Sequence, residues 1–447
     1  MASARYAPPP RSGGTFASLR HVQFRWIYGS NIAFFFAMNG QFVVRSYLAF
    51  KLTDSAFSLG IVNLAVAIPM LFISPFGGVI ADRVEKKRLI MVGQALLLVN
   101  ELIILALLVM GRLEFWHLLV VVFAMGCIFP FIMPARQAIV ANIVGRQGLG
   151  NAMALGMGGM NAARVVGPVT AGLVIAVAGV RWMYFVAVLL YLCALLAMSR
   201  IDRAYPSGEA GKKSVMGDLL DGVRYVRDDA PVRALLVLSL VPIMLAMPFQ
   251  ALLVVFAEDV WDVGSPGLGF LQAAAGFGGI LGSVFVAWRG ESPRKLRLMM
   301  VSLLAFCGSL LLFALSPWFL LALPLVLIAD VFASTFTTVN NTIIQVLIPD
   351  AVRGRVMSLM MMTFGLTPLG TVPVAAAAQA WGAPAAVAGA AALTVVIGAA
   401  IYLASASLRG IDKTSADALR AEISGGDGQP AVLGRPGAGA VSRATSP

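Results

Sequence analysis

The sequence predicts an all-α membrane protein with twelve transmembrane helices in two six-helix bundles and with both termini in the cytoplasm. Three observations predict it. Of the 447 residues 59% are hydrophobic and 12% charged, apolar segments recur along the chain, and basic residues gather in alternate connections. Soluble domains carry about 25% charged residues, and a mean hydropathy of +0.88 is typical of a chain in lipid. We therefore expect no soluble enzyme.

Twelve apolar segments are long enough to cross a bilayer, which takes about 20 residues of helix. Backbone groups in hydrocarbon must be paired within the segment, so segments of this length favour helices over barrel strands. The first six are 26–50, 57–81, 89–110, 115–133, 152–178 and 182–198, and the second six are 234–256, 268–288, 296–315, 318–348, 356–380 and 385–408.

Most of the 33 Lys and Arg residues lie in the two tails and in every second connection. Because Lys and Arg collect on the cytoplasmic side of membrane proteins, this pattern predicts that both termini are cytoplasmic. The net charge of +12 is thus explained by orientation, and we expect no nucleic-acid partner. The first apolar segment is longer than that of a signal peptide, so we expect it to be retained as a span.

The segments divide the chain into five parts. We expect a cytoplasmic tail (1–25), a six-helix bundle (26–198), a cytoplasmic linker with an amphipathic helix (199–233), a second bundle (234–408) and a disordered tail (409–447). A repeat supports two bundles, because Gln137 to Val144 matches Gln345 to Val352 at the equivalent place. Cys127, Cys193 and Cys307 have no paired spacing, so we expect neither a disulfide nor a metal site.

The connection after the second segment reads Gly78-Val-Ile-Ala-Asp82-Arg83-Val-Glu85-Lys-Lys87-Arg88. It resembles the signature of the major facilitator superfamily, although Glu85 stands where that signature has its second glycine. Other segments resemble the subgroup of enterobactin exporters and macrolide efflux proteins: Leu52-Thr-Asp-Ser-Ala, Pro134-Ala-Arg136-Gln137-Ala, Asn151-Ala, Ala163-Arg164-Val-Val-Gly167-Pro168, and Gln345 through Asp350 to Arg353-Gly354-Arg355. The resemblance implies the major facilitator fold and drug:proton antiport.

The same connection predicts a gate at the cytoplasmic mouth. Asp82 beside basic residues can form an ion pair at a helix end, and in the family this loop closes against the start of helix 11. The alternative is that these residues only orient the loop. The predicted gate comprises Gly78, Asp82, Arg83, Lys87, Arg88, Arg136, Asp350, Arg353 and Arg355.

Glu101, Arg164 and Asp330 each lie about twelve residues inside a span, near the midplane. A charge there costs about 2.5 to 3.5 kcal/mol on insertion scales, so we expect Arg164 to form a buried charge set with the two acids. The alternative is a purely structural ion pair. Asp330 is the preferred proton carrier, because helix 10 lines the cavity in this fold, and Glu101 is the alternative. Arg45, near the end of the first span, is expected to extend to the interface.

Uncharged polar and aromatic residues predict an amphipathic substrate cavity. Its predicted residues are Arg164, Asn39, Gln41, Gln250, Phe249, Phe336 and Asn340. Gly167-Pro168 predicts a bend in helix 5, since proline frees a backbone carbonyl and glycine permits close packing. Close packing and a role in blocking leak are equally open for this pair.

These features favour a secondary active transporter of the inner membrane that exports a bulky amphipathic small molecule, such as a drug or siderophore, in exchange for protons. An importer or a lysophospholipid flippase on the same fold is the alternative, and a non-transporting membrane receptor is a more distant one. No GxxxxGKS loop occurs, and we expect no enzyme activity, cofactor or metal. The expected partners are substrate, protons and the lipid bilayer, and the expected state is a monomer.

Overall fold

The computed structural model describes residues 16–202, 215–289, 294–348, 352, 356, 359–360, 363, 366–405 and 407–410. Within these ranges the side chains at 17, 75–79, 81–83, 146–147, 215–216 and 218–221 are outside the description. Most of each tail is also outside it, so the disorder expected there stays a prediction.

Each of the twelve apolar segments coincides with helix where it is described, apart from short turns such as 246–248, and the described residues contain no strand. The first elements are η1 (Ala17–Arg20), α1 (Val22–Thr53), α2 (Ala56–Arg83), α3 (Lys86–Val109), α4 (Phe115–Ala178), α5 (Val180–Ser199) and α6 (Val215–Asp228). Then come α7 (Ala230–Leu245), α8 (Phe249–Val255), a π-helical turn η2 (Phe256–Val260), α9 (Gly264–Arg289), α10 (Lys295–Ala314), α11 (Phe319–Leu347), α13 (Thr367–Trp381) and α14 (Ala383–Ala404).

Ten helical stretches in the described part are long and apolar enough to cross a membrane. Two of them, Phe115–Gly145 and Gly148–Ala178, make up α4 and follow one another across a kink at Gly145. The elements α7, α8 and η2 together form one stretch, Ala230–Val260. Neither α1 nor α13 is among the ten. The structure therefore supports ten spans, and twelve spans remain a proposal.

The predicted segment 115–133 ends too early, because α4 continues past Pro134 to a kink at Gly145. Gly145 has φ +66, a left-handed conformation that glycine adopts without steric cost. A proline inside a membrane helix is tolerated where neighbouring helices compensate for the lost hydrogen bond. This continuation places Arg136 within a helix, not in a connection.

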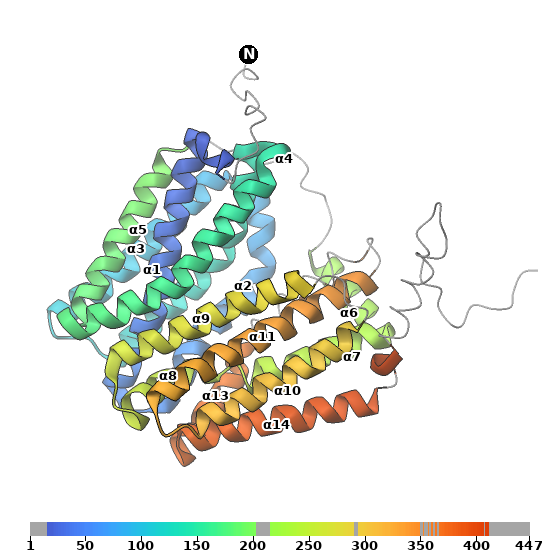
Figure 1. Cartoon of the computed structure of the whole chain (residues 1–447). Coiled ribbons are helices and arrows are strands. Elements are labelled where there is room, and N and C mark those ends of the chain that lie inside the picture. The colour runs from blue at the N-terminus through green and yellow to red at the C-terminus, as the bar shows by residue number, and fades with distance from the viewer. Residues whose placement is uncertain are drawn as a thin grey trace, which may run out of the picture.

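The helices form two groups, α1–α5 and α7–α14, with α6 between them in the chain (Figure 1). We call the end where α1 begins and α14 finishes the terminal end, and the opposite end the far end. The groups meet through α4 on α9 and α2 on α13. The hydroxyl of Ser265 donates to the carbonyl of Gly172 at 3.2 Å, near the far end. Toward the terminal end the two groups diverge (Figure 1).

Small residues allow this contact. A methyl group on Gly172 would lie 2.5 Å from the carbonyl oxygen of Ser265 and 3.1 Å from the Cα of Gly269. Helix association in lipid depends on such close backbone approach, because burial of apolar surface gives no driving force there. The α4 and α9 backbones therefore need glycine at this crossing.

We predict that Gly172→Ala destabilises the protein, because the added methyl group overlaps the α9 backbone. Overpacking of this kind costs about 1–3 kcal/mol. The measurement is the thermal unfolding midpoint of purified protein in detergent, which should fall by several degrees. Gly308→Ala is the matched control, since a methyl group there would meet nothing within 4 Å. Equal midpoints for the two variants would contradict the prediction.

Candidate functional site

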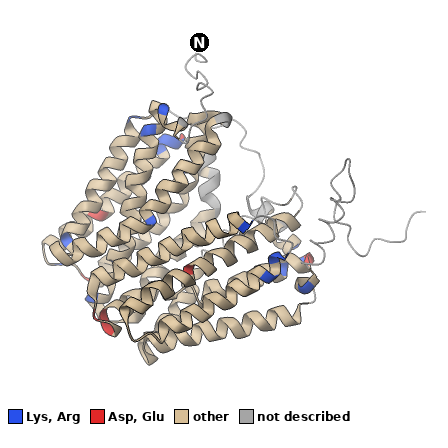
Figure 2. Ribbon diagram, viewed as in Figure 1, with Lys and Arg blue, Asp and Glu red and all other residues tan. Residues whose placement is uncertain are grey.

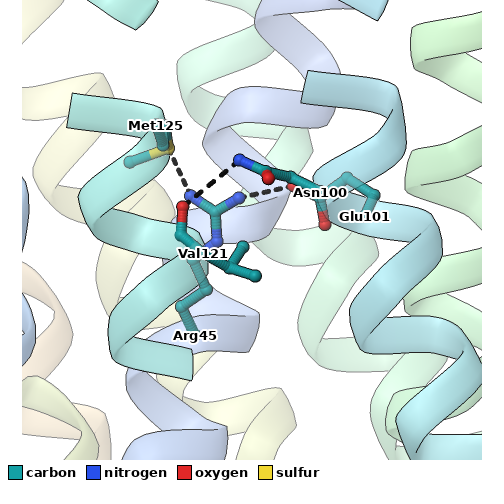
Figure 3. A network of polar contacts seen from close by, with 5 residues as sticks. All are labelled: Arg45, Asn100, Glu101, Val121 and Met125. Carbon is teal, nitrogen blue, oxygen red and sulfur yellow. Dashed lines mark hydrogen bonds and ion pairs between the residues drawn. The ribbon is translucent and has the colours of Figure 1, made fainter. Parts of the chain in front are cut away.

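Glu101 on α3 is fully buried and forms an ion pair with Arg45 on α1, with the Arg45 Nη2 and Glu101 Oε1 atoms 2.5 Å apart. Figure 3 shows the guanidinium between α3 and α4, where it also contacts the sulfur of Met125. Beside it, Asn100 donates to the carbonyl of Val121 at 3.3 Å. The expectation that Arg164 pairs with Glu101 is therefore corrected, because Arg45 occupies that place.

Arg45 also differs from its sequence expectation. It is 7% exposed and points into the helix group, whereas we expected it to extend to the interface. The reason is that α1 continues to Thr53, which places Arg45 about two turns inside the helix. Glu101 lies opposite Arg45 on α3 and pairs with it. The sequence of α1 alone could not reveal this partner.

Asp330 on α11 is 4% exposed and lies in the second group. Its Oδ1 accepts a hydrogen bond from the amide of Gln250 on α8 at 3.1 Å, and its Oδ2 is buried without a hydrogen-bond partner. The α9 helix passes close by, since a methyl group on Gly278 would lie 3.0 Å from the Asp330 Cβ. Gln250, predicted for the cavity, is therefore next to the predicted proton carrier.

Arg164 belongs to α4 in the first group but lies along α9 of the second. Methyl groups on Gly276 and Gly279 would come within 2.8 Å of the Arg164 carbonyl and 3.2 Å of its Nη1. Arg164 is exposed, and it lies close enough to Asp330 for an electrostatic interaction, without a direct ion pair. The structure thus brings Arg164, Asp330 and Gln250 together across the two groups.

A pocket in the second group contains two of the predicted cavity residues, Phe336 and Asn340. It is formed by α7, Met247 in the following turn, α10, α11 and residues 360 and 363, and none of the described lining residues is ionisable. The Oδ1 of Asn340 is buried without a partner. The residues that line it are Ser239, Pro242, Ile243, Met247, Phe306, Ala333, Phe336, Thr337, Asn340, Asn341, Met360 and Thr363.

The other predicted cavity residues lie elsewhere. Phe249 is 2% exposed and packs edge-on against Phe306 and Phe313 in the core. Asn39 donates to the carbonyl of Phe35 in its own helix at 2.8 Å. Gln41 is fully buried in the first group, and both polar atoms of its side chain lack partners.

Gly167 and Pro168 lie at a double crossing of α4. A methyl group on Gly167 would lie 3.3 Å from the backbone nitrogen of Gly40 on α1, and one on Gly269 of α9 would lie 2.6 Å from the Pro168 carbonyl. Proline cannot bond the carbonyl four residues earlier, which is that of Arg164. This geometry favours close packing, and leak prevention stays a prediction.

The predicted gate is only partly described. The backbone of Gly78, Asp82 and Arg83 forms the end of α2, their side chains are outside the description, and Asp350, Arg353 and Arg355 are outside it entirely. Arg88 is exposed in the first turn of α3. Lys87 donates to the carbonyls of Ser199, at 3.0 Å, and Ile201 after α5. Arg136 is 3% exposed inside the first group and does not lie at the mouth.

Two polar contacts that the sequence did not predict join the groups at the far end. The Nζ of Lys51 on α1 lies 2.5 Å from Oε2 of Glu258 in η2, and the hydroxyl of Ser55 donates to Gln379 of α13 at 2.9 Å. Glu258 lies in a π-helical turn, a rare local geometry often found at functional sites. The sequence feature that could have indicated this contact is the acidic pair Glu258-Asp259, which directly follows an apolar segment.

Comparison with solved structures confirms the fold. The chain is similar to the nucleoside transporter NupG, with a TM-score of 0.71, 13% identity and coverage of 86% of this chain and 98% of that one. It is also similar to a bacterial homologue of the human lysosomal transporter Spinster in an inward-facing, unoccupied conformation, with a TM-score of 0.69, 15% identity and coverage of 90% and 99%.

Curated relatives are exporters. The chain is 27% identical to the multidrug efflux pump Tap of Mycolicibacterium fortuitum, over 75% of this chain and 84% of that protein. It is 25% identical to the enterobactin exporter EntS of Escherichia coli O1:K1 / APEC, over 63% and 67%. The family model described as transmembrane secretion effector matches residues 13–423. The chain therefore belongs to this family of efflux transporters within the major facilitator superfamily.

Proposed function

We propose that the protein exports a bulky amphipathic small molecule, such as a drug or a siderophore, in exchange for protons. The observation that carries this proposal is the group of Asp330, Gln250 and Arg164, which joins a buried acid in one helix group to a cation in the other. An acid whose surroundings change when the groups move can bind and release a proton in step with substrate access. Glu101 is the second candidate carrier.

The polar partners support Asp330 over Glu101. Glu101 is already neutralised by Arg45 within one helix group, so movement of the groups leaves this pair intact. Asp330 keeps one oxygen without a partner and interacts with Arg164 only across the contact with α9. Separation of the groups would remove that interaction.

The proposed substrate is supported by the pocket and by the relatives. Phe336 and the two methionines Met247 and Met360 offer adaptable apolar surface, and Asn340 offers a free acceptor. The relatives bear the names multidrug efflux pump and enterobactin exporter. We propose that this pocket and Arg164 face the substrate pathway. Phe249 and Gln41 are buried in the core, so they would contact substrate only after a rearrangement of the helices.

Orientation and assembly belong to the same proposal: twelve spans, cytoplasmic termini, the inner membrane and a monomer. Lys and Arg gather near the terminal ends of the helices (Figure 2), as the positive-inside rule requires of a cytoplasmic face. If the terminal end is cytoplasmic, this structure, whose groups touch at the far end and diverge at the terminal end, is the state open to the cytoplasm. Closure of that face is assigned to Gly78, Asp82, Arg83, Arg88, Asp350, Arg353 and Arg355, while Lys87 caps α5.

Transport in inside-out vesicles under an imposed pH gradient tests the proposal and its rivals. Proton-driven accumulation of members of a drug and siderophore panel supports export. Accumulation only in right-side-out vesicles would favour an importer, movement of lysophospholipid would favour a flippase, and binding without transport would favour a receptor.

We predict that Asp330→Asn abolishes accumulation driven by a pH gradient but preserves exchange of substrate down its own gradient, because asparagine cannot carry the proton. One proton moving down about 100 mV supplies about 2.3 kcal/mol, enough for roughly fiftyfold accumulation. Vesicle uptake of the substrate found in the panel measures both modes.

The comparison variant is the double change Arg45→Gln with Glu101→Gln, which removes the buried pair without leaving one charge alone. If Asp330→Asn retains wild-type accumulation and the double variant loses it, Glu101 is the carrier. If both retain it, neither acid couples transport to protons.

We also predict that breaking the Lys51 to Glu258 ion pair opens the far end. Lys51 is half-exposed, so the pair stabilises closure by about 1 kcal/mol at most, and Glu258→Gln should change the ratio of closed to open states up to about fivefold. Spin labels at positions 112 and 381, in a chain without its three cysteines, report the separation of the groups.

The charge-exchanged variant Lys51→Glu with Glu258→Lys should restore the wild-type distance distribution. Asp262→Asn is the control, because it removes an exposed acid next to η2 and asparagine tolerates its left-handed backbone. An unchanged distribution in Glu258→Gln would show that the pair does not hold the far end closed.

A further inference from the structure

Two of the described arginines of the first helix group are buried, in different electrostatic surroundings. Arg45 is 7% and Arg136 3% exposed. Arg45 is neutralised by Glu101. Among the described side chains, the ionisable one close enough to Arg136 to interact with it is Tyr191, which is not a carboxylate. Arg136 is therefore a buried positive charge that no described acidic side chain neutralises.

The contacts of Arg136 leave one edge of the guanidinium free. Its Nη1 donates to the side-chain oxygen of Asn31 on α1, and its central carbon lies 4.0 Å from the centroid of the Phe34 ring. The Nε and Nη2 atoms are buried and have no hydrogen-bond partner. These two N–H groups form the edge with which arginine binds two oxygens of a carboxylate.

A bound anion would satisfy both requirements of this site. Water could accept hydrogen bonds from Nε and Nη2, but it would not neutralise the charge, and an uncompensated buried charge is strongly unfavourable. The cation–π contact with Phe34 compensates only part of that penalty. An oxyanion would accept both hydrogen bonds and supply the missing negative charge.

The position of the site fits a ligand that enters from the terminal end. Arg136 precedes the Gly145 kink by nine residues, and Asn31 follows the start of α1 by nine, so both lie about 14 Å from that end. The two helix groups diverge there (Figure 1). Asn31 is partly exposed, which gives an edge for access.

The surroundings beyond the guanidinium are aromatic and apolar. The Phe34 ring packs against Tyr191 and Phe129 with ring centroids 5.8 and 6.1 Å apart, and this cluster continues to Leu97 and Ile132. A ligand with an anionic group next to an apolar body matches this combination of one cation and an aromatic cluster.

We propose that Arg136, with Asn31 and Phe34, binds the carboxylate of an amphipathic organic anion that the protein transports. This rests on the proposed export function and narrows its substrate class to organic acids. Arg136 provides the two-pronged contact, Asn31 holds the guanidinium in orientation, and Phe34 supports its face. A free inorganic or small organic oxyanion has the same chemistry and is the competing source.

The test measures thermal unfolding of the full-length protein in detergent. The probes are fusidate, a bulky amphipathic molecule with one carboxylate, its uncharged methyl ester, and formate, each at constant ionic strength. Fusidate should raise the unfolding midpoint of the wild type in a saturable way, and the ester should not. Arg136→Gln should weaken fusidate binding at least about tenfold, while Arg136→Lys should bind with intermediate affinity.

The control is Arg112→Gln, which removes an exposed arginine at the far end and should bind fusidate like the wild type. Ligand-free Arg136→Gln should unfold at or above the wild-type temperature, because it removes an uncompensated charge; a markedly lower midpoint would indicate a structural role and reject the site. Equal binding of acid and ester, absence of carboxylate binding, or wild-type binding by Arg136→Gln would also overturn the proposal.

Formate separates the two sources. An Arg136-dependent shift with formate but not with fusidate would support an oxyanion site and reject the substrate assignment. The measurement uses no proton gradient, so its result does not depend on proton antiport. If the wild-type protein accumulates substrate in vesicles but does not bind fusidate or formate, the anion site is rejected and the proposed export function stands.

Discussion

A charge inside the hydrocarbon of a membrane must be neutralised, hydrated or shared, and the described helices are organised around this constraint. Arg45 and Glu101 neutralise each other within one helix group. Asp330 is partly stabilised by Gln250 and depends for charge compensation on Arg164 from the other group. Arg136 contacts an amide and an aromatic ring, and no acid among the described side chains neutralises it. The three cases differ in what compensates the charge. Arg45 and Glu101 form an ion pair within one group, Asp330 and Arg164 interact across the groups and movement can alter that interaction, and the charge of Arg136 is compensated, in our proposal, by a ligand.

The helix positions could be predicted from the sequence because hydrophobic length is a local property. Each predicted segment lies on helix wherever the structure describes it, and Arg164 lies close enough to Asp330 for an electrostatic interaction. The partner of Glu101 could not be predicted, because depth along a helix does not give the direction of a side chain. Arg45 was assigned to the interface for the same reason, since the end of an apolar run is not the end of the helix.

Other site residues could not be placed because their environment depends on how the helices pack. Phe249 and Phe336 are the same residue type and both are buried in the core, yet of the two Phe336 alone borders the pocket. Arg136 was expected at the mouth because the apolar segment 115–133 ends just before it. The helix α4 continues past Pro134 and thereby places Arg136 inside the group.

The kink in α4 has a mechanical consequence. Its two spans meet at Gly145, whose torsion angles are not helical, so we expect their relative motion to be concentrated there. The first span contains Arg136. The second span contains Arg164 and Gly172, which lie against α9 of the opposite group. A ligand bound at Arg136 can thus change the angle between the two spans at Gly145. That change reaches the contact between α4 and α9, at which the two helix groups meet.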